Sequence, residues 1–196
     1  LGVFGTRYFD KFKLGANLDF NRNLVHFYGF QSPPELFSKS ETKHSMNDLH
    51  GRVFLSSLNK SKDDWQYSTA LDFYNFSDNR KANETNVKFE AEGSKLMNNA
   101  MFSMYASFEG GEIKQELFNF NRSIFRLRPK FVLRENLYTL EAGANLAFET
   151  NNGKNDLRIY PQVRGEYQII DDAFKVYGEV SGDLQRNDLR SFSREN

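Results

Sequence analysis

The residues with the greatest potential for chemistry are three histidines, His26, His44 and His50, and the carboxylate of Asp48. A hydrolytic site would need a histidine beside an aspartate or a nucleophilic serine, because the histidine then acts as a general base. His26, His50 and Asp48 could meet at one end of a strand pair, but their spacing is loose. No cysteine is present to complete a zinc site. The sequence therefore favours a protein that is not an enzyme and has no metal or cofactor.

The glycine positions and the net charge argue against binding of nucleotides or nucleic acids. Gly110-Gly111 and Asn152-Gly153 are typical of turns, and the chain contains neither a GxGxxG nor a Walker pattern that would cradle phosphates. The formal net charge is zero, with 26 basic and 26 acidic residues. No basic excess is available to neutralise a phosphate backbone, so the sequence predicts no nucleic-acid partner.

The composition combines many aromatic rings with a polar average. The 196 residues include 20 Phe and 9 Tyr, yet only 39% are hydrophobic. Such a mixture is unusual for a soluble core but expected of strands with one lipid-facing side and one wet side. No run of about 18 apolar residues occurs, which argues against a membrane-spanning helix.

Alternation with a period of two is the dominant pattern in the chain, and segment 137–149 displays it best. A strand places alternate residues on opposite faces, whereas a helix would scatter them. The apolar face of this segment carries Tyr138, Leu140, Ala142, Ala144, Leu146 and Phe148.

The same period predicts further strands along the whole chain. They span 1–9, 12–27, 49–58, 64–76, 86–94, 99–108, 123–133, 157–169 and 174–184. Short turns at 10–11, 59–63, 95–98, 134–136 and 170–173 alternate with longer loops at 28–48, 77–85, 109–122, 150–156 and after 184. Strands of soluble proteins usually contain about 5–6 residues, but a tilted transmembrane strand needs about 9–11. We therefore expect an all-β fold, an antiparallel transmembrane β-barrel of about ten strands that forms one domain over 1–196 and belongs to a larger barrel.

Aromatic residues on the apolar faces fall into two groups. One group lies beside the short turns and comprises Phe12, Trp65, Tyr67, Phe131, Tyr138, Tyr167 and Phe174. The other lies towards the longer loops and comprises Phe20, Phe73, Phe108, Phe125 and Phe148. Two aromatic belts with smaller apolar residues between them are typical of the two membrane interfaces.

The opposite face is predicted to line the lumen. Its charged residues include Arg126, Arg128, Lys130, Glu141, Arg158, Arg164, Glu166 and Glu179. A hairpin around Asp171-Asp172 would bring Arg164 to Glu179, and the turn at 134–136 would bring Arg128 and Lys130 to Glu141. Cross-strand pairs of this kind contribute about 0.2–1 kcal/mol each. These arginines either select solutes in an open lumen or form structural ion pairs in a blocked one.

Two prolines lie in the middle of predicted strands, and one predicted loop is long and rich in apolar residues. Pro129 and Pro161 lack the N–H that a closed barrel uses, so we expect either a bulge at each or a shorter lipid-facing band there. Loop 28–48, with Phe30, Pro33-Pro34, Leu36 and Phe37, is the stretch expected to contact other envelope proteins or to fold over the lumen.

Three stretches carry a resemblance to a known family. They are NRNLVHFYGF (21–30), DFYNFSD (72–78) and LQRNDLRSF (184–192). They resemble Bacteroidota outer-membrane β-barrels of the TonB-dependent receptor-like family, which are large barrels without an evident catalytic site. The resemblance implies an integral protein of the bacterial outer membrane with lipid as its main partner. The chain shows neither a plug domain nor a TonB box, so active uptake is not implied.

Three functions are compatible with this reading. The first is porin-like or receptor-like solute passage, and the second is a non-transporting structural or assembly subunit of an outer-membrane complex. The third is a soluble all-β binding protein. Because the chain starts at Leu1 and ends in a predicted loop, we expect it to be part of a longer mature protein.

Overall fold

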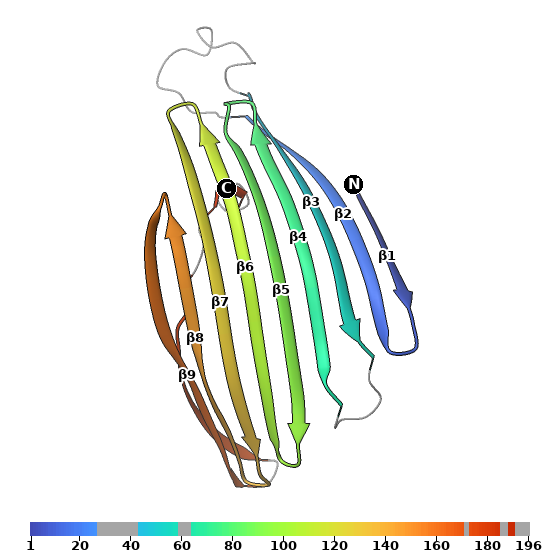
Figure 1. Ribbon diagram of the computed structural model, residues 1–196, viewed down its shortest axis with the longest axis vertical. Coiled ribbons are helices and arrows are strands. Elements are labelled where there is room, and N and C mark those ends of the chain that lie inside the picture. The colour runs from blue at the N-terminus through green and yellow to red at the C-terminus, as the bar shows by residue number, and fades with distance from the viewer. Residues whose placement is uncertain (27–42, 59–63, 171–172, 185–187, 191–196) are drawn as a thin grey trace.

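The protein is one antiparallel sheet of ten strands that follow each other in sequence order (Figure 1). The computed structural model describes residues 1–26, 43–58, 64–170, 173–184 and 188–190. The strands are β1 (Gly2–Tyr8), β2 (Phe12–His26), β3 (Lys43–Ser57), β4 (Gln66–Asp78), β5 (Asn83–Met97), β6 (Ala100–Gln115), β7 (Phe118–Arg134), β8 (Tyr138–Asn151), β9 (Lys154–Ile170) and β10 (Phe174–Ser181). The predicted all-β class and the ten antiparallel strands are confirmed.

The sheet is curved but open. In the described ranges β1 and β10 are its two edges, and neither pairs with the other. Both are short, with 7 and 8 residues against 13–17 in the other strands. No helix within the described ranges is long and apolar enough to span a membrane.

Cross-strand register aligns the apolar positions of neighbouring strands. One row of paired residues runs from β2 to β9 and comprises Ala16, Val53, Leu71, Phe89, Phe108, Phe125, Phe148 and Leu157. Directly paired residues point to the same face of an antiparallel sheet, so this row is continuous across eight strands. The predicted period of two therefore holds from strand to strand as well as along each strand.

The connections differ from the prediction at one end of the sheet. The loops expected at 77–85, 109–122 and 150–156 are tight turns at 79–82, 116–117 and 152–153, since the strands on both sides are longer than expected. Alternation fades beyond the Phe row because polar residues occupy both faces there, as Glu112 and Asn121 do on the apolar side. The predicted alternation of short and long connections is therefore wrong for these three. Residues 43–48 of the predicted loop 28–48 belong to β3, and 27–42 lie outside the described residues.

Of the two sequence pairs predicted to form turns, one forms a turn and the other lies inside a strand. Asn152-Gly153 forms the turn between β8 and β9, and both residues have positive φ, 46° and 81°. That combination suits the type I′ turn that joins two antiparallel strands. Gly110-Gly111 lies inside β6 and is paired on both sides, so its prediction as a turn is wrong.

Neither proline produces the expected bulge. The ladder between β7 and β8 omits Arg128 and Pro129 and then resumes in the same register at Lys130 and Gly143. The missing N–H of Pro129 therefore interrupts the ladder without changing the register. The two backbones stay close there: a Cβ added to Gly143 would lie 2.6 Å from the carbonyl oxygen of Pro129. Pro161 lies just beyond the last residue pair of β9 and β10, where that side of β9 has no strand in the described ranges.

Candidate functional site

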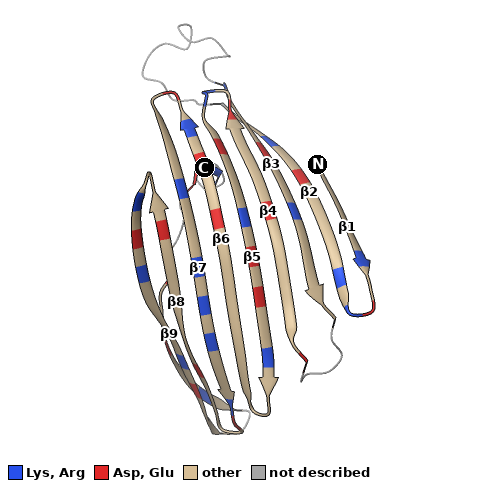
Figure 2. Cartoon of the chain, viewed as in Figure 1, with Lys and Arg blue, Asp and Glu red and all other residues tan. Residues whose placement is uncertain are grey.

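The two faces of the sheet differ sharply in chemistry and exposure. The outer face, which carries the Phe row, leaves large apolar side chains open: Leu157 and Ile159 are 60% and 64% exposed. The inner face buries polar side chains: Glu84 and Asn145 are fully buried. Side chains converge on a concave surface and splay on a convex one, so the polar face is the concave one. Figure 2 shows basic positions spread along β7, beside acidic positions on β5 and β6.

All eight residues predicted to line the lumen lie on the inner face. Register places them there together: Arg126, Arg128, Lys130, Glu141, Arg158, Arg164, Glu166 and Glu179. Arg164 is the cross-strand partner of both Glu141 and Glu179. The Lys130 ammonium lies 3.6 Å from the Glu141 carboxylate. Arg128, in contrast, does not extend to Glu141 and contacts Asn145 instead, at 3.1 Å.

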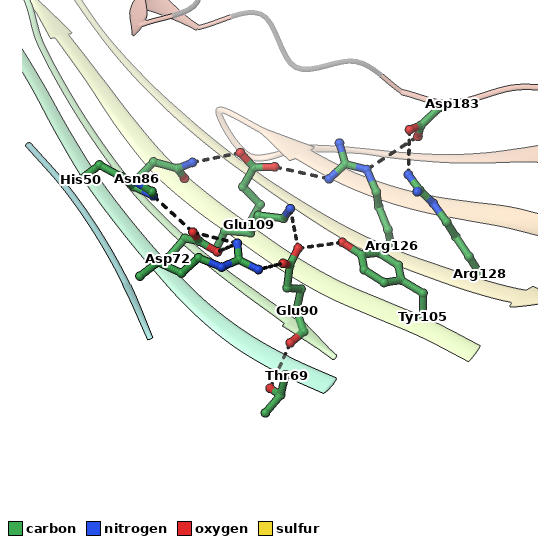
Figure 3. Close-up of polar contacts among 12 residues, drawn as sticks. His50, Thr69, Asp72, Asn86, Glu90, Tyr105, Glu109, Arg126, Arg128 and Asp183 are labelled. Carbon is green, nitrogen blue, oxygen red and sulfur yellow. Dashed lines mark hydrogen bonds and ion pairs between the residues drawn. The ribbon is translucent and has the colours of Figure 1, made fainter. Parts of the chain in front are cut away.

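A second polar cluster on β3–β6 was not identified from the sequence. Arg52 donates to Asp72 at 2.8 Å and to Glu90 at 2.6 Å, while Tyr105 donates to Glu90 at 3.2 Å (Figure 3). His50 contacts Asp72 at 3.2 Å. Inward alternation on each strand is the signal that would have found these residues, but only the register shows which of them meet.

His44 and His50 contact aspartates other than Asp48, and the His26 side chain lies outside the part of the chain that the structure describes. His50 contacts Asp72, whereas Asp48 accepts a hydrogen bond from Arg190 at 2.8 Å. His44 contacts Asp78 at 2.9 Å. Among the described residues no group of three or more His, Cys, Asp or Glu is placed to hold a metal ion.

After β10 the chain turns back over the inner face, and we call residues 182–184 and 188–190 the strap. Its near end is held by β7 and β8. Arg128 donates to the Asp183 carboxylate at 2.7 Å (Figure 3). The Asn145 amide donates to the same carboxylate at 2.8 Å. Arg126 donates to the carbonyl oxygen of Leu184 at 3.0 Å. The Leu184 side chain packs into the small buried apolar cluster of Ile124, Ala147 and Tyr160.

The far end of the strap makes polar contacts with three other strands. They join Asp188 to the Tyr74 hydroxyl of β4, the Leu189 amide to Glu84 of β5, and Arg190 to Asp48 of β3, at 3.0, 2.8 and 2.8 Å. The strap thus crosses the concave face from β8 to β3. The strand predicted over 174–184 is too long, because β10 ends at Ser181 and the chain then turns back over the inner face.

The Asp183 carboxyl titrates in a basic surrounding. Partial burial raises its pKa, but the hydrogen bond from Asn145 and the charges of Arg128 and Arg126 lower it by more. The net effect holds the pKa of Asp183 below its ordinary value of 3.8. The carboxylate is therefore ionised at neutral pH and pairs with the two arginines.

The predicted interface aromatics all lie exposed on the outer surface. They are Trp65, Tyr67, Phe131, Tyr138, Phe148, Tyr167 and Phe174. Tyr138 pairs with Tyr167 near the turn end of β8, and Phe148 pairs with Phe125 near its other end. Register adds Phe89, which sequence reasoning left out of the belt because it lies in the middle of the predicted strand 86–94.

No protein-family model matches this chain, and neither a curated protein nor a solved structure matches it.

Proposed function

We propose that this chain is part of an integral β-barrel of a bacterial outer membrane. The observation that carries the proposal is the apolar band of the outer face and its height. From Tyr138 to Phe148 the strand β8 advances ten residues. At about 3.3 Å per residue and a tilt of about 40°, this corresponds to a band roughly 25 Å high, the value typical of outer-membrane barrels.

The size of the exposed apolar surface supports the same conclusion. Soluble monomers rarely expose contiguous apolar patches larger than a few hundred Å². Here the side chains of Phe89, Phe108, Phe125 and Phe148 are exposed, and so are those of Met104, Phe131, Leu140 and Val163 on the same face. Lipid chains would cover this band and keep its apolar side chains out of water, while the polar inner face stays in water.

The open edges fit a portion of a larger barrel. Backbone N–H and C=O groups that face lipid without a partner are strongly unfavourable, so a membrane sheet has to close. We therefore propose that β1 and β10 pair with further strands, which also explains why the ten strands do not close on themselves. The resemblance of residues 21–30, 72–78 and 184–192 to TonB-dependent receptor-like barrels of Bacteroidota fits this proposal.

Two activities remain for such a barrel. Charged residues along the inner face suit solute passage of the porin or receptor kind. The strap favours the alternative, a non-transporting structural or assembly subunit, since it crosses the inner face and forms hydrogen bonds with five strands, β3, β4, β5, β7 and β8. Residues 27–42, which lie outside the described residues, are the proposed contact with other envelope proteins.

Trp65 tests the membrane proposal, because it is the single tryptophan of the chain. In vesicles, its fluorescence should be quenched by lipids brominated near the headgroup more strongly than by lipids brominated near the chain end. The matched control is W65F/Y105W, which moves the tryptophan to the inner face, where aqueous iodide should quench it and brominated lipid should not. A protein that is monodisperse in buffer without detergent, with Trp65 insensitive to brominated lipid, would overturn the proposal.

Conductance separates the two activities. Planar bilayers containing the intact protein should show defined channels if solutes pass, and silence if the barrel is structural. Removal of the strap by truncation after Ser181 is the informative variant. Channels that appear only in this variant would identify the strap as the plug.

A further inference from the structure

The near end of the strap occupies a group of donors that is built like a receptor for a carboxylate. Arg128 and Asn145 each donate to one oxygen of Asp183, and the Nε of Arg126 lies 3.8 Å from the same carboxylate. Guanidinium and amide groups present their N–H donors in a plane, which matches the two oxygens of a carboxylate. Figure 3 shows Arg126 and Arg128 side by side, both directed at Asp183.

Asp183 does not use all of these donors. The Nε of Arg126 is buried and has no hydrogen-bond partner among the described residues, because 3.8 Å exceeds hydrogen-bond distance. Ser107 pairs with Arg126 across the strands and is 1% exposed. Its hydroxyl also has no hydrogen-bond partner among the described residues. Buried donors without partners are unfavourable, so the site has unused capacity for an oxygen ligand.

The charges around the site define the ligand further. Arg126 and Arg128 carry two positive charges, and Glu109, 3.3 Å from Arg126, carries one negative charge. Without Asp183, one net positive charge remains (2 − 1 = 1). A single carboxylate therefore neutralises the site, whereas a dianion would leave it with excess negative charge.

We propose that Arg126, Arg128, Asn145 and Ser107 form a binding site for the carboxylate group of a small solute, in which Asp183 acts as a built-in competitor. The proposal does not rest on membrane insertion, since the site is assembled by one face of the sheet alone.

The exposure of Asp183 and its attachment to the chain both allow a solute carboxylate to replace it at the site. The Asp183 side chain is 52% exposed, so a solute can approach from the open side of the inner face. An intramolecular ligand on a short tether competes at an effective concentration in the millimolar range. Free carboxylates should therefore bind the wild-type protein weakly and bind a protein without the Asp183 carboxylate more tightly.

Trifluoroacetate, followed by its ¹⁹F line width, is a suitable probe for the detergent-solubilised chain, with trifluoroacetamide as the neutral control. Asp183→Ala should lower the dissociation constant for trifluoroacetate about tenfold or more, and D183A/R128Q should return binding to the background. Asp156→Ala is the matched control, because it frees the more exposed Arg158 from its 2.7 Å ion pair with Asp156 and should gain no binding.

The proposal is overturned if D183A binds no tighter than wild type, if D183A/R128Q keeps the gain, or if D156A gains equally. A measurement on the wild type covers the case in which D183A fails to fold. At constant ionic strength, trifluoroacetate should accelerate trypsin cleavage at Arg190, while trifluoroacetamide should not. Equal cleavage with both compounds would also refute the competition.

Discussion

Arg128 of β7 donates to Asp183 over 2.7 Å, and this contact joins residues that are 55 positions apart in the chain. It is the shortest polar link between the sheet and the near end of the strap among the described residues. Asp183 lies two residues beyond the end of β10 at Ser181, so the same contact holds the chain that leaves the edge of the sheet against the concave face.

The coupling between Arg128 and Asp183 should be modest. Their side chains are 28% and 52% exposed, and solvent screens such pairs. A double-mutant cycle of Arg128→Gln and Asp183→Asn, measured by urea unfolding in detergent, should give a coupling free energy of about 0.2–1 kcal/mol. The pair Lys81 and Glu116, which is more exposed at 73% and 64%, should give less. A coupling near zero for Arg128 and Asp183 would show that the strap is held by its other contacts.

Acidification should loosen the near end of the strap. The pKa of Asp183 is lower in the folded protein than its ordinary value of 3.8, so its ionised form favours attachment. This contribution is complete above the ordinary value and is lost as the pH falls through the folded value. The charged groups that face Asp183 are Arg128 and Arg126.

Hydrogen exchange of the Leu184 amide, which donates to Asp183 at 2.7 Å, reports this change. Once corrected for the intrinsic pH dependence, its protection should fall below about pH 4 in the wild type, near the ordinary pKa of an aspartate. Asp183→Asn should abolish the pH step. Retention of the step in that variant would assign the titration to another group.

Charge on the outer face should be most damaging in the middle of the apolar band. Ala142→Arg lies between Tyr138 and Phe148 on β8, and in a lipid bilayer it should destabilise the protein by about 2–4 kcal/mol. Asn121→Arg lies on the same face of β7 beyond the Phe row and should change stability by only about 0–1 kcal/mol. Unfolding in vesicles by guanidinium measures both. Equal effects at the two positions would contradict a lipid-facing band.

A methyl group at Gly143 should be poorly tolerated. Its Cβ would lie 2.6 Å from the Pro129 carbonyl oxygen and 3.2 Å from the Lys130 Cα, and both atoms belong to the backbone, which cannot move aside easily. Gly143→Ala should therefore cost about 1–3 kcal/mol. Gly178→Ala is the control, since nothing lies within 4 Å of the position of its Cβ. The same urea titration compares them, and a neutral Gly143→Ala would show that β7 and β8 can separate locally.

The sequence by itself determined the class of fold and the two faces of each strand. Alternation is a local property: residues such as Tyr138, Leu140 and Phe148 belong to one face whatever the neighbouring strand is. The prediction weakened where both faces are polar, as at Glu112 and Asn121, because no apolar face is then needed to mark the strand. Three turns were read as longer loops for this reason.

Only the tertiary structure decided which residues meet across strands. The partners of Arg128 and Arg52, the row that contains Phe89, and the tolerance of Pro129 beside Gly143 all depend on register, which sums small preferences over whole strands. The path of the strap back over the inner face could not be predicted from the sequence either. Contacts such as Arg190 to Asp48 span 142 residues, and no local pattern in the sequence encodes the concave surface that brings these two side chains together.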